Sequence, residues 1–213
     1  MNFHIVTLFP EAFTSYFNQS ILKRAQDSGV ISFYFYNPRD FTNDPHKRID
    51  QKPYGGGPGM VIQAEPVIKA IAKAIGRKKK ILVVWLTPGG KDFTNTQAHK
   101  FAAEYKDIVF ICGRYEGIDA RVKEVFSVTE VSIGQYVITG GELAAMVIVD
   151  AISRQVEGVL GDPDSVEENR IASHNVYTRP ETFIYKKKKY SVPDVLLSGH
   201  HKEIEEWKKN KKT

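Results

Sequence analysis

Glu116 stands in the first of two short segments in which glycines and polar groups directly follow an apolar run. This segment covers residues 111–119, and the second covers residues 132–142. Glycine lets a backbone approach a ligand closely because it has no side chain. Ligands of open α/β sheets gather beyond the carboxyl ends of the strands, so a carboxylate in such a loop can face the ligand. We expect the two segments to form two walls of one ligand pocket; the other interpretation of Glu116 is a solvated loop acid.

Arg154 is the second candidate for chemistry, because it interrupts an apolar helical pattern over residues 142–156. It follows Asp150 by four residues, which is the spacing of an intrahelical ion pair. A guanidinium near a ligand can instead stabilise an oxygen that gains negative charge. Both roles are open on the residues alone.

Several familiar site types are excluded by spacing. The glycine cluster at 53–60 lacks the dinucleotide fingerprint because Met60 takes the position of its third glycine, and Trp85 takes the first glycine position of a phosphate-binding loop ending at 89–91. The cluster fits either a polar surface loop or a close backbone approach. The histidines have no metal-ligand spacing, so we expect no metal site. The single Cys112 predicts a packed core thiol and a reducing, cytoplasmic location.

The charge of the chain is concentrated near its end. Of the 213 residues 42% are hydrophobic and 26% are charged, with a net charge of +5. No apolar run is long enough to span a membrane, and the first residues do not resemble a secretory signal. Residues 186–213 hold nine lysines against four acids and so carry all the excess. These lysines either grip phosphates or form a solvated tail.

The apolar periodicity predicts an α/β fold. The central strands are continuously apolar, as strands buried on both faces of a parallel sheet are. The helix over 142–156 is apolar on nearly all sides, which predicts burial, partly against a partner chain. The predicted strands are 3–8, 31–36, 80–86, 107–112 and 127–133, and the other predicted helices cover 21–29 with Ser20 as cap, 67–75 and 94–105.

The chain divides into three parts. Residues 1–156 form the predicted α/β domain, and residues 157–179 lose periodicity and gather glycine, proline and asparagine, as linkers do. Residues 180–213 form a short basic helical module, in which 193–197 lead to Ser198-Gly199 and a helix over about 201–209.

At this point the motifs resemble those of bacterial tRNA (guanine-N1)-methyltransferases, the TrmD family of the SPOUT superfamily. The resemblance extends from Met1 to Trp207. Its motifs are Phe-Pro-Glu at 9–11, Pro-Tyr-Gly-Gly-Gly-Pro-Gly-Met at 53–60, Cys-Gly-Arg-Tyr-Glu-Gly-Ile-Asp at 112–119, Ser-Ile-Gly at 132–134, Thr-Gly-Gly-Glu-Leu-Ala at 139–144, Tyr-Thr-Arg-Pro at 177–180 and Val-Leu-Leu-Ser-Gly-His-His at 195–201.

The resemblance implies a parallel sheet whose carboxyl-terminal part is threaded into a trefoil knot, and a homodimer with the active site at its interface. It implies S-adenosylmethionine as cofactor, an assisting Mg²⁺ ion, and guanosine 37 in the anticodon loop of tRNA as substrate. The implied cofactor-binding residues are Leu86, Thr87, Pro88, Gly113, Tyr115, Glu116, Ser132, Ile133, Gly134, Gln135, Tyr136, Val137, Ile138, Gly140 and Gly141.

The resemblance also implies roles for single residues. Methyl transfer to guanine N1 needs a base for its proton and a cation for the charge on O6; the base position falls on Asn169, and Arg154 is the cation. Glu116 would contact the methionyl end of the cofactor or the magnesium ion. The implied substrate-binding residues are Tyr54, Gly55, Gly57, Gly59, Ser198, Gly199 and His200.

Some features depart from the family pattern. The expected aspartate is replaced by Asn169, whose amide cannot accept a proton at neutral pH, so Glu168 or Glu167 is the candidate substitute base. The alternative function is a weakened or silent homologue that binds S-adenosylmethionine and tRNA. The linker is shorter than the pattern, the chain ends where family members continue with helices, and Gln51 stands where a second aspartate is expected. A general RNA chaperone would explain the lysines but none of the glycine loops.

Overall fold

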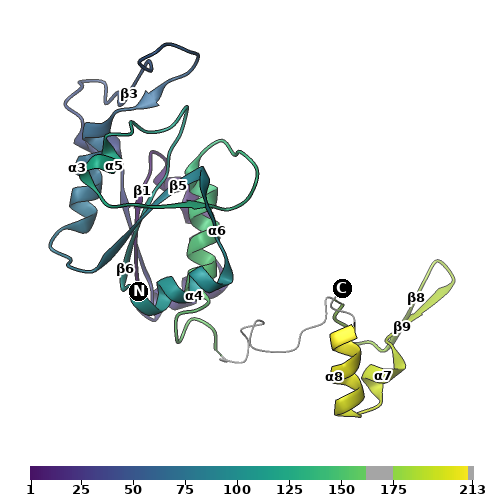
Figure 1. Ribbon diagram of the computed structural model, residues 1–213. Helices are drawn as coiled ribbons and strands as arrows, with labels where there is room; N and C mark the ends of the chain where they lie inside the picture. The colour runs from purple at the N-terminus through teal and green to yellow at the C-terminus, as the bar shows by residue number, and fades with distance from the viewer. Residues whose placement is uncertain (162–174, 211–213) are drawn as a thin grey trace. The chain divides into compact units, whose positions relative to one another are not determined.

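The computed structural model describes residues 1–161 and 175–210, which belong to two compact units, Met1–Gly161 and Asp162–Thr213. The first unit is built on a parallel sheet of five strands in the order β2-β1-β6-β5-β7 (Figure 1). This confirms the predicted α/β class and all five predicted strands. The strands are β1 (Asn2–Val6), β2 (Ser32–Tyr36), β5 (Ile81–Asp92), β6 (Asp107–Ile111) and β7 (Thr129–Ser132).

The sheet separates two hydrophobic cores, because successive side chains of a strand point to opposite faces. In β5, Leu82 and Val84 join one core while Val83 and Trp85 join the other. This explains why the central strands are apolar at every position. Helices α2 (Ser20–Asp27), α4 (Asn95–Glu104) and α6 (Gly141–Ser153) pack on the first core, and α3 (Ala64–Ile75) and α5 (Val122–Val125) pack on the second (Figure 1).

The helix boundaries follow local chemistry. Helix α4, predicted over 94–105, begins after Thr94, which caps it in a capping box with Gln97. The prediction of Ser20 as a cap is wrong: the N-cap of α2 is Gln19, without a side-chain hydrogen bond. Helix α3 begins at Ala64 rather than at Val67, because a proline is tolerated in the first turn, where its missing N–H is not needed. Helix α6 ends at Ser153, three residues before the predicted end.

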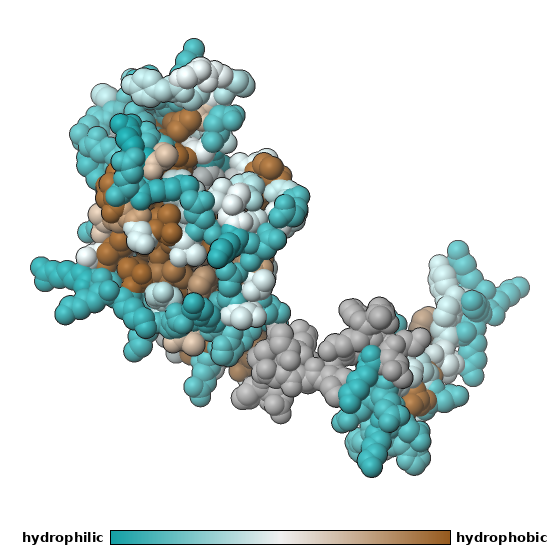
Figure 2. Space-filling view, in the orientation of Figure 1, coloured by the Kyte–Doolittle hydropathy of each residue, from teal (hydrophilic) through white to brown (hydrophobic). Residues whose placement is uncertain are grey.

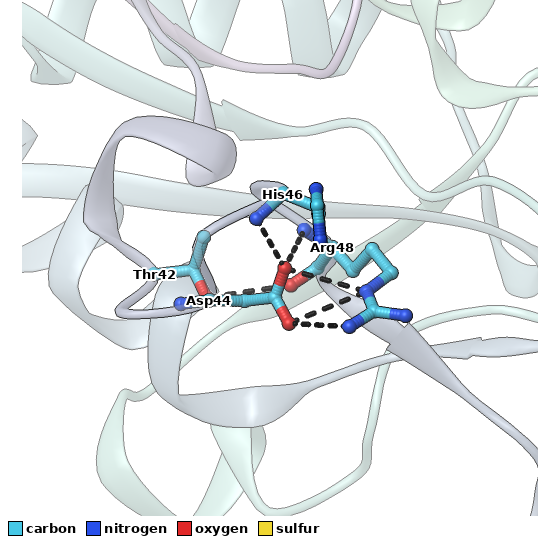
Figure 3. Close-up of polar contacts among 4 residues, drawn as sticks. All are labelled: Thr42, Asp44, His46 and Arg48. Carbon is cyan, nitrogen blue, oxygen red and sulfur yellow. Dashed lines mark hydrogen bonds and ion pairs between the residues drawn. The ribbon is translucent and has the colours of Figure 1, made fainter.

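The first unit also contains short helices and a small antiparallel hairpin of two strands. They are η1 (Pro10–Phe13), α1 (Thr14–Phe17), η2 (Pro38–Phe41), β3 (Asp50–Gln51) and β4 (Val61–Ile62). The segment before β3 is held by Asp44, whose carboxylate accepts hydrogen bonds from the backbone of His46 and from the backbone and guanidinium of Arg48 (Figure 3). The bond from Arg48 lowers the pKa of Asp44 to about 2, so this loop keeps its charge at any ordinary pH.

The second unit holds a hairpin and two helices. The predicted helix over 201–209 is present as α8 (His201–Asn210), and a short helix α7 (Asp194–Leu197) precedes it without having been predicted. The ring of Trp207 in α8 lies 6.1 Å from that of Tyr177. The hairpin of β8 (Thr182–Tyr185) and β9 (Lys188–Ser191) was not predicted. Hydrophilic side chains cover most of this unit in Figure 2. In residues 1–161 and 175–210, no helix is long and apolar enough to cross a membrane.

His4 in β1 is a buried polar group of the sheet, with 2% of its surface exposed. Its Nε2 lies 2.9 Å from Asp107 Oδ1 and its Nδ1 lies 3.1 Å from the hydroxyl of Tyr36. Burial lowers the pKa of His4 below 6.5, against the opposing effect of Asp107. The sheet therefore folds around a neutral imidazole.

We predict that His4 makes the protein less stable in mild acid. The unfolded chain takes up the proton first as the pH falls below about 6.5, so this contribution is complete above that pH and is lost as the pH falls through the lower folded pKa. Urea unfolding of the wild type between pH 7.5 and 5 should show a fall in the free energy of unfolding of up to about 1.4 kcal/mol per pH unit. The His4→Asn variant should fall less steeply; parallel profiles would contradict the assignment.

Candidate functional site

A cavity of about 450 Å³ lies beyond the carboxyl ends of β6 and β7 and beside residues 85–88 of β5. Its walls are formed by these residues of β5 and by the loops that follow β6 and β7. All but one of the residues predicted for the cofactor line it. They are Leu86, Thr87, Pro88, Gly113, Tyr115, Glu116, Ser132, Ile133, Gly134, Tyr136, Val137, Ile138, Gly140 and Gly141. The exception is Gln135, whose amide donates to Asp92 Oδ1 at 3.4 Å.

A buried ion pair closes the floor of this region. Glu142 lies in the first turn of α6 with 2% of its surface exposed. Its Oε2 accepts a hydrogen bond from Nε of Arg114 at 2.9 Å, and its Oε1 accepts one from the hydroxyl of Thr7 at 2.8 Å. The helix N-terminus also favours a carboxylate there. Glu142 therefore ties α6 to the ends of β1 and β6.

Arg114 has a second contact that fixes its orientation. Its guanidinium carbon lies 4.7 Å from the centre of the Phe9 ring, in a cation–π geometry. Phe9 follows β1, so the side chain of Arg114 bridges the segments after β1 and β6 to α6. The neighbouring Cys112 is buried, as predicted; burial first and Glu142 second raise its pKa well above the ordinary value. This thiol is a packed core group.

Two glycines allow α6 to begin against β6. A Cβ atom at Gly141 would lie 2.7 Å from the Cα of Cys112, closer than real contacts, and the backbone N–H of Gly141 donates to the carbonyl of Gly113 at 2.9 Å. A Cβ atom at Gly140 would collide with the side chain of Arg114. The glycines at 140 and 141 are therefore required by close packing, and they let backbone groups line the cavity.

The glycine-rich loop before β4 packs on Glu116. The backbone N–H of Glu116 donates to the carbonyl of Met60 at 3.0 Å. Gly59 has φ +84, and a Cβ atom there would lie 2.6 Å from Glu116 Oε1. Of the predicted substrate-binding residues that are described in the first unit, Gly59 is thus the one that packs against a residue of the cavity wall. Tyr54, at the tip of the loop, is fully exposed and lines a separate open hollow of about 1370 Å³.

The other predicted substrate residues have local surroundings. Gly55 and Gly57 have positive φ and open space around them. Ser198, Gly199 and His200 belong to the second unit, where the hydroxyl of Ser198 accepts from the backbone N–H of His200 at 3.1 Å and donates to Val195. Their role toward a substrate stays a prediction.

Arg154 lies at the far end of α6 from the cavity. It is the C-cap residue and is half-buried, and it does not line the cavity. At 1.5 Å per residue, the helix from Glu142 to Arg154 spans about 18 Å. Asp150 accepts a hydrogen bond from the hydroxyl of Tyr16 at 2.5 Å. Asn169, Glu168 and Glu167 lie outside the described residues.

Sequence reasoning missed part of the cavity wall. The main omission is Arg114, although it stands inside the predicted segment 111–119; the one available signal was a charged Glu142 at the start of an apolar helix, since such a residue needs a partner. Another is Lys123, whose Nζ lies 5.0 Å from the Trp85 ring and 2.5 Å from Glu130. The other lining residues outside the predicted cofactor set are Trp85, Gly117, Ile118, Ala120, Val131, Thr139 and Ala144, of which Gly117, Ile118 and Thr139 lie in the two segments expected to form the pocket walls.

The fold and the site define a parallel α/β protein with a cavity near the carboxyl ends of its strands, where the ligands of such folds bind. Its sequence matches that of known proteins over its whole length. The family described as tRNA (Guanine-1)-methyltransferase TrmD matches residues 1–213. The chain therefore belongs to the tRNA (guanine-1)-methyltransferase family.

Individual relatives carry the same name, tRNA (guanine-N(1)-)-methyltransferase. The protein of Carboxydothermus hydrogenoformans is 47% identical over 98% of this chain and 81% of its own length. The protein of Clostridioides difficile is 43% identical over 98% of this chain and 91% of its own. That of Buchnera aphidicola is 44% identical over 97% of this chain and 87% of its own.

We predict that Arg114→Met destabilises the protein because it leaves the Glu142 carboxylate buried with one donor fewer. The loss in the free energy of unfolding should be about 2 to 3 kcal/mol, at the low end for a broken buried pair because the Arg114 side chain is 27% exposed. The double variant Arg114→Met/Glu142→Gln should recover part of that loss, since the uncompensated charge is gone. Chemical denaturation of both variants measures the difference; additive losses would contradict the pairing.

Proposed function

We propose that this chain transfers a methyl group from S-adenosylmethionine to N1 of guanosine 37 in tRNA. The observation that carries the proposal is the cavity formed by residues 85–88 of β5 and by the loops after β6 and β7, in a chain of the tRNA (guanine-1)-methyltransferase family. The cofactor supplies an electrophilic methyl group. The chain itself must bind it, position the guanine, remove the N1 proton and offset the charge on O6.

The cavity has the size and character that this cofactor requires. Its volume of about 450 Å³ falls in the range of small-molecule sites, roughly 300–1,000 Å³. Ile133 and Ile138 supply apolar walls, and the glycines of residues 132–141 leave backbone N–H and carbonyl groups accessible to the edges of an adenine. The carboxylate of Glu116 suits the positively charged methionyl end, or an assisting Mg²⁺ ion bound mainly by waters.

The trefoil knot belongs to this proposal. In it, residues 113–119 and 132–141 pass around the segment at the end of β5. Two observations support the arrangement. Strand β5 pairs with β7 on both sides of an interruption between Leu86 and Lys91, and the isolated bridge between Arg114 and Gly140 joins the two loops.

A homodimer completes the site in this proposal. Leu143 and Val147 on α6 are 60% and 52% exposed, and Arg154 follows eleven residues after Leu143, three full turns along the same helix face. The apolar face therefore leads from the cavity to Arg154. Within one chain, Arg154 lies about 18 Å along α6 from Glu142, at the end away from the cavity. A second copy packed antiparallel on this face would bring the partner's Arg154 toward the cavity.

In the reaction, Arg154 would offset the negative charge that develops on guanine O6. The proton acceptor is assigned to the linker, residues 157–179, with Glu168 or Glu167 substituting for the amide of Asn169. Residues 1–156 would form the catalytic domain, and residues 180–213 would contact tRNA.

Incubation of the full chain with S-adenosylmethionine and an unmodified tRNA transcript carrying G37 should yield 1-methylguanosine. Mass analysis of the digested nucleosides detects the product, and a transcript with adenosine at position 37 is the control. Retained binding of both ligands without product would support the silent homologue instead.

The same assay tests the substitute base. With either glutamate as acceptor, one of Glu167→Gln and Glu168→Gln should lower kcat by about a hundredfold or more, because general-base catalysis contributes on this order. Unchanged rates in both variants would refute that role and leave position 169 to be tested by Asn169→Asp.

Mixed dimers test whether two chains share one site. Arg154→Ala and the cavity variant Gly134→Val should each be nearly inactive alone. In a one-to-one mixture, half of the dimers hold one complete site, so about a quarter of the wild-type activity should return. A site built within one chain would give no recovery. Thermal melting of each variant checks that both are folded.

A further inference from the structure

We propose that the hairpin of β8 and β9 is a platform on which unpaired bases of the tRNA stack. The proposal rests on the proposed tRNA substrate and adds a binding surface outside the cavity. The hairpin presents its side chains to solvent along almost its whole length, since every residue from Phe183 to Tyr185 and from Lys188 to Ser191 is exposed.

One face of the hairpin carries three aromatic rings. Phe183 pairs with Tyr190 and Tyr185 pairs with Lys188 in the strand register. Paired residues share a face, and so do residues two apart, so these four side chains lie together. The rings of Phe183 and Tyr190 stack at 5.3 Å with an interplanar angle of 13°. Tyr185 is 58% exposed, which leaves its ring accessible to a flat ligand.

Lysines surround these rings. Nζ of Lys186 lies 5.5 Å from the centre of the Tyr185 ring, and Nζ of Lys188 lies 5.4 Å from that of Tyr190. Residues 182–191 contain four lysines and no acidic residue. The platform therefore combines flat apolar rings with a dense positive charge, which is the chemistry that binds single-stranded nucleic acid.

The turn of the hairpin favours a functional use of its lysines. Lys186 and Lys187 have φ of +47 and +63. Two-residue hairpin turns with positive φ at both positions are normally made by Asn-Gly or similar pairs. Lysine is a poor choice for that backbone, so the turn is better explained by the charge that it presents.

The opposite face of the β8–β9 hairpin provides a control position for substitutions. There Ile184 pairs with Lys189, and Thr182 hydrogen-bonds Ser191 across the strands at 3.1 Å. This face has no aromatic ring. Ile184 is 74% exposed, more than Tyr185, so its replacement controls for any general effect of removing an exposed side chain from the hairpin.

The test measures binding of the full chain to a fluorescent tRNA transcript by anisotropy at several salt concentrations. Tyr185→Ala should raise the Kd about tenfold, the size of effect expected from losing one stacked base, with the salt dependence unchanged. Lys187→Gln should weaken binding and reduce the slope of log K against log salt by about 0.7, as for one lost phosphate contact with a single strand. Ile184→Ala should match the wild type.

Three results would overturn the proposal. One is an equal Kd for Tyr185→Ala, Ile184→Ala and the wild type. Another is an equal loss of affinity of Tyr185→Ala for tRNA and for an RNA duplex of similar length, because a duplex has no unpaired base to stack. The third is unchanged tRNA binding with reduced binding to phosphatidylserine vesicles, which would assign the platform to membranes.

Kinetics separate this proposal from the proposed function. Tyr185→Ala should raise the KM for tRNA about tenfold without changing kcat or the KM for S-adenosylmethionine, because stacking of unpaired bases on the hairpin contributes equally to the bound substrate and to the transition state. If the wild type methylates G37 and Tyr185→Ala binds tRNA normally, the platform alone is refuted. If the wild type makes no 1-methylguanosine, the proposed function fails, and the anisotropy series still decides the platform.

Discussion

The buried carboxylate of Glu142 is the constraint on which the arrangement of this protein depends. A charge at 2% exposure is costly to desolvate, and three sources offset that cost here: the hydroxyl of Thr7, the guanidinium of Arg114 and the N-terminus of α6. Each source comes from a different part of the chain, so the carboxylate is satisfied only when β1, β6 and α6 meet at one point. The loops that line the cavity begin at these same points. The geometry of the cavity is therefore set by the packing of polar groups beneath it.

The sequence predicted the scaffold and the cavity wall because both depend on local signals. Strands buried on two faces must be apolar at every position, and loops that present backbone to a ligand must contain glycine. The Arg114–Glu142 pair depends on a contact across 28 positions, which no spacing rule reveals. The β8–β9 hairpin was missed because its local signals are misleading: lysines occupy strand and turn positions where they are disfavoured. Local propensity therefore fails where the residues of a segment are ones that its backbone conformation disfavours.

Helix α6 carries Glu142 and Arg154 at opposite ends, so one chain does not bring these two residues together. Its first turn anchors the cavity through Glu142, and its last residues carry Arg154 at the other end. A straight helix cannot bring both ends to one ligand, so a methyltransferase built on it requires either two sites or two chains. The exposed Leu143 and Val147 between the ends favour two chains, because exposed apolar residues that share one helix face often mark an interaction surface. In the proposed dimer the same helix would supply the floor of one site and the cation of the other.

In the proposed reaction the two units of the chain would divide the work of binding the ligands. The cavity of the first unit has the volume of a small-molecule site and is assigned to S-adenosylmethionine, so recognition of a large RNA would need contacts outside it. The second unit would supply such contacts, and both units belong to one chain. Once an RNA is held by one unit, its contact with the other is effectively intramolecular, and the two affinities reinforce each other. A weak, exposed platform of rings and lysines would therefore be sufficient. Its modest affinity would let the product leave, while binding by both units would supply the selectivity for a large substrate.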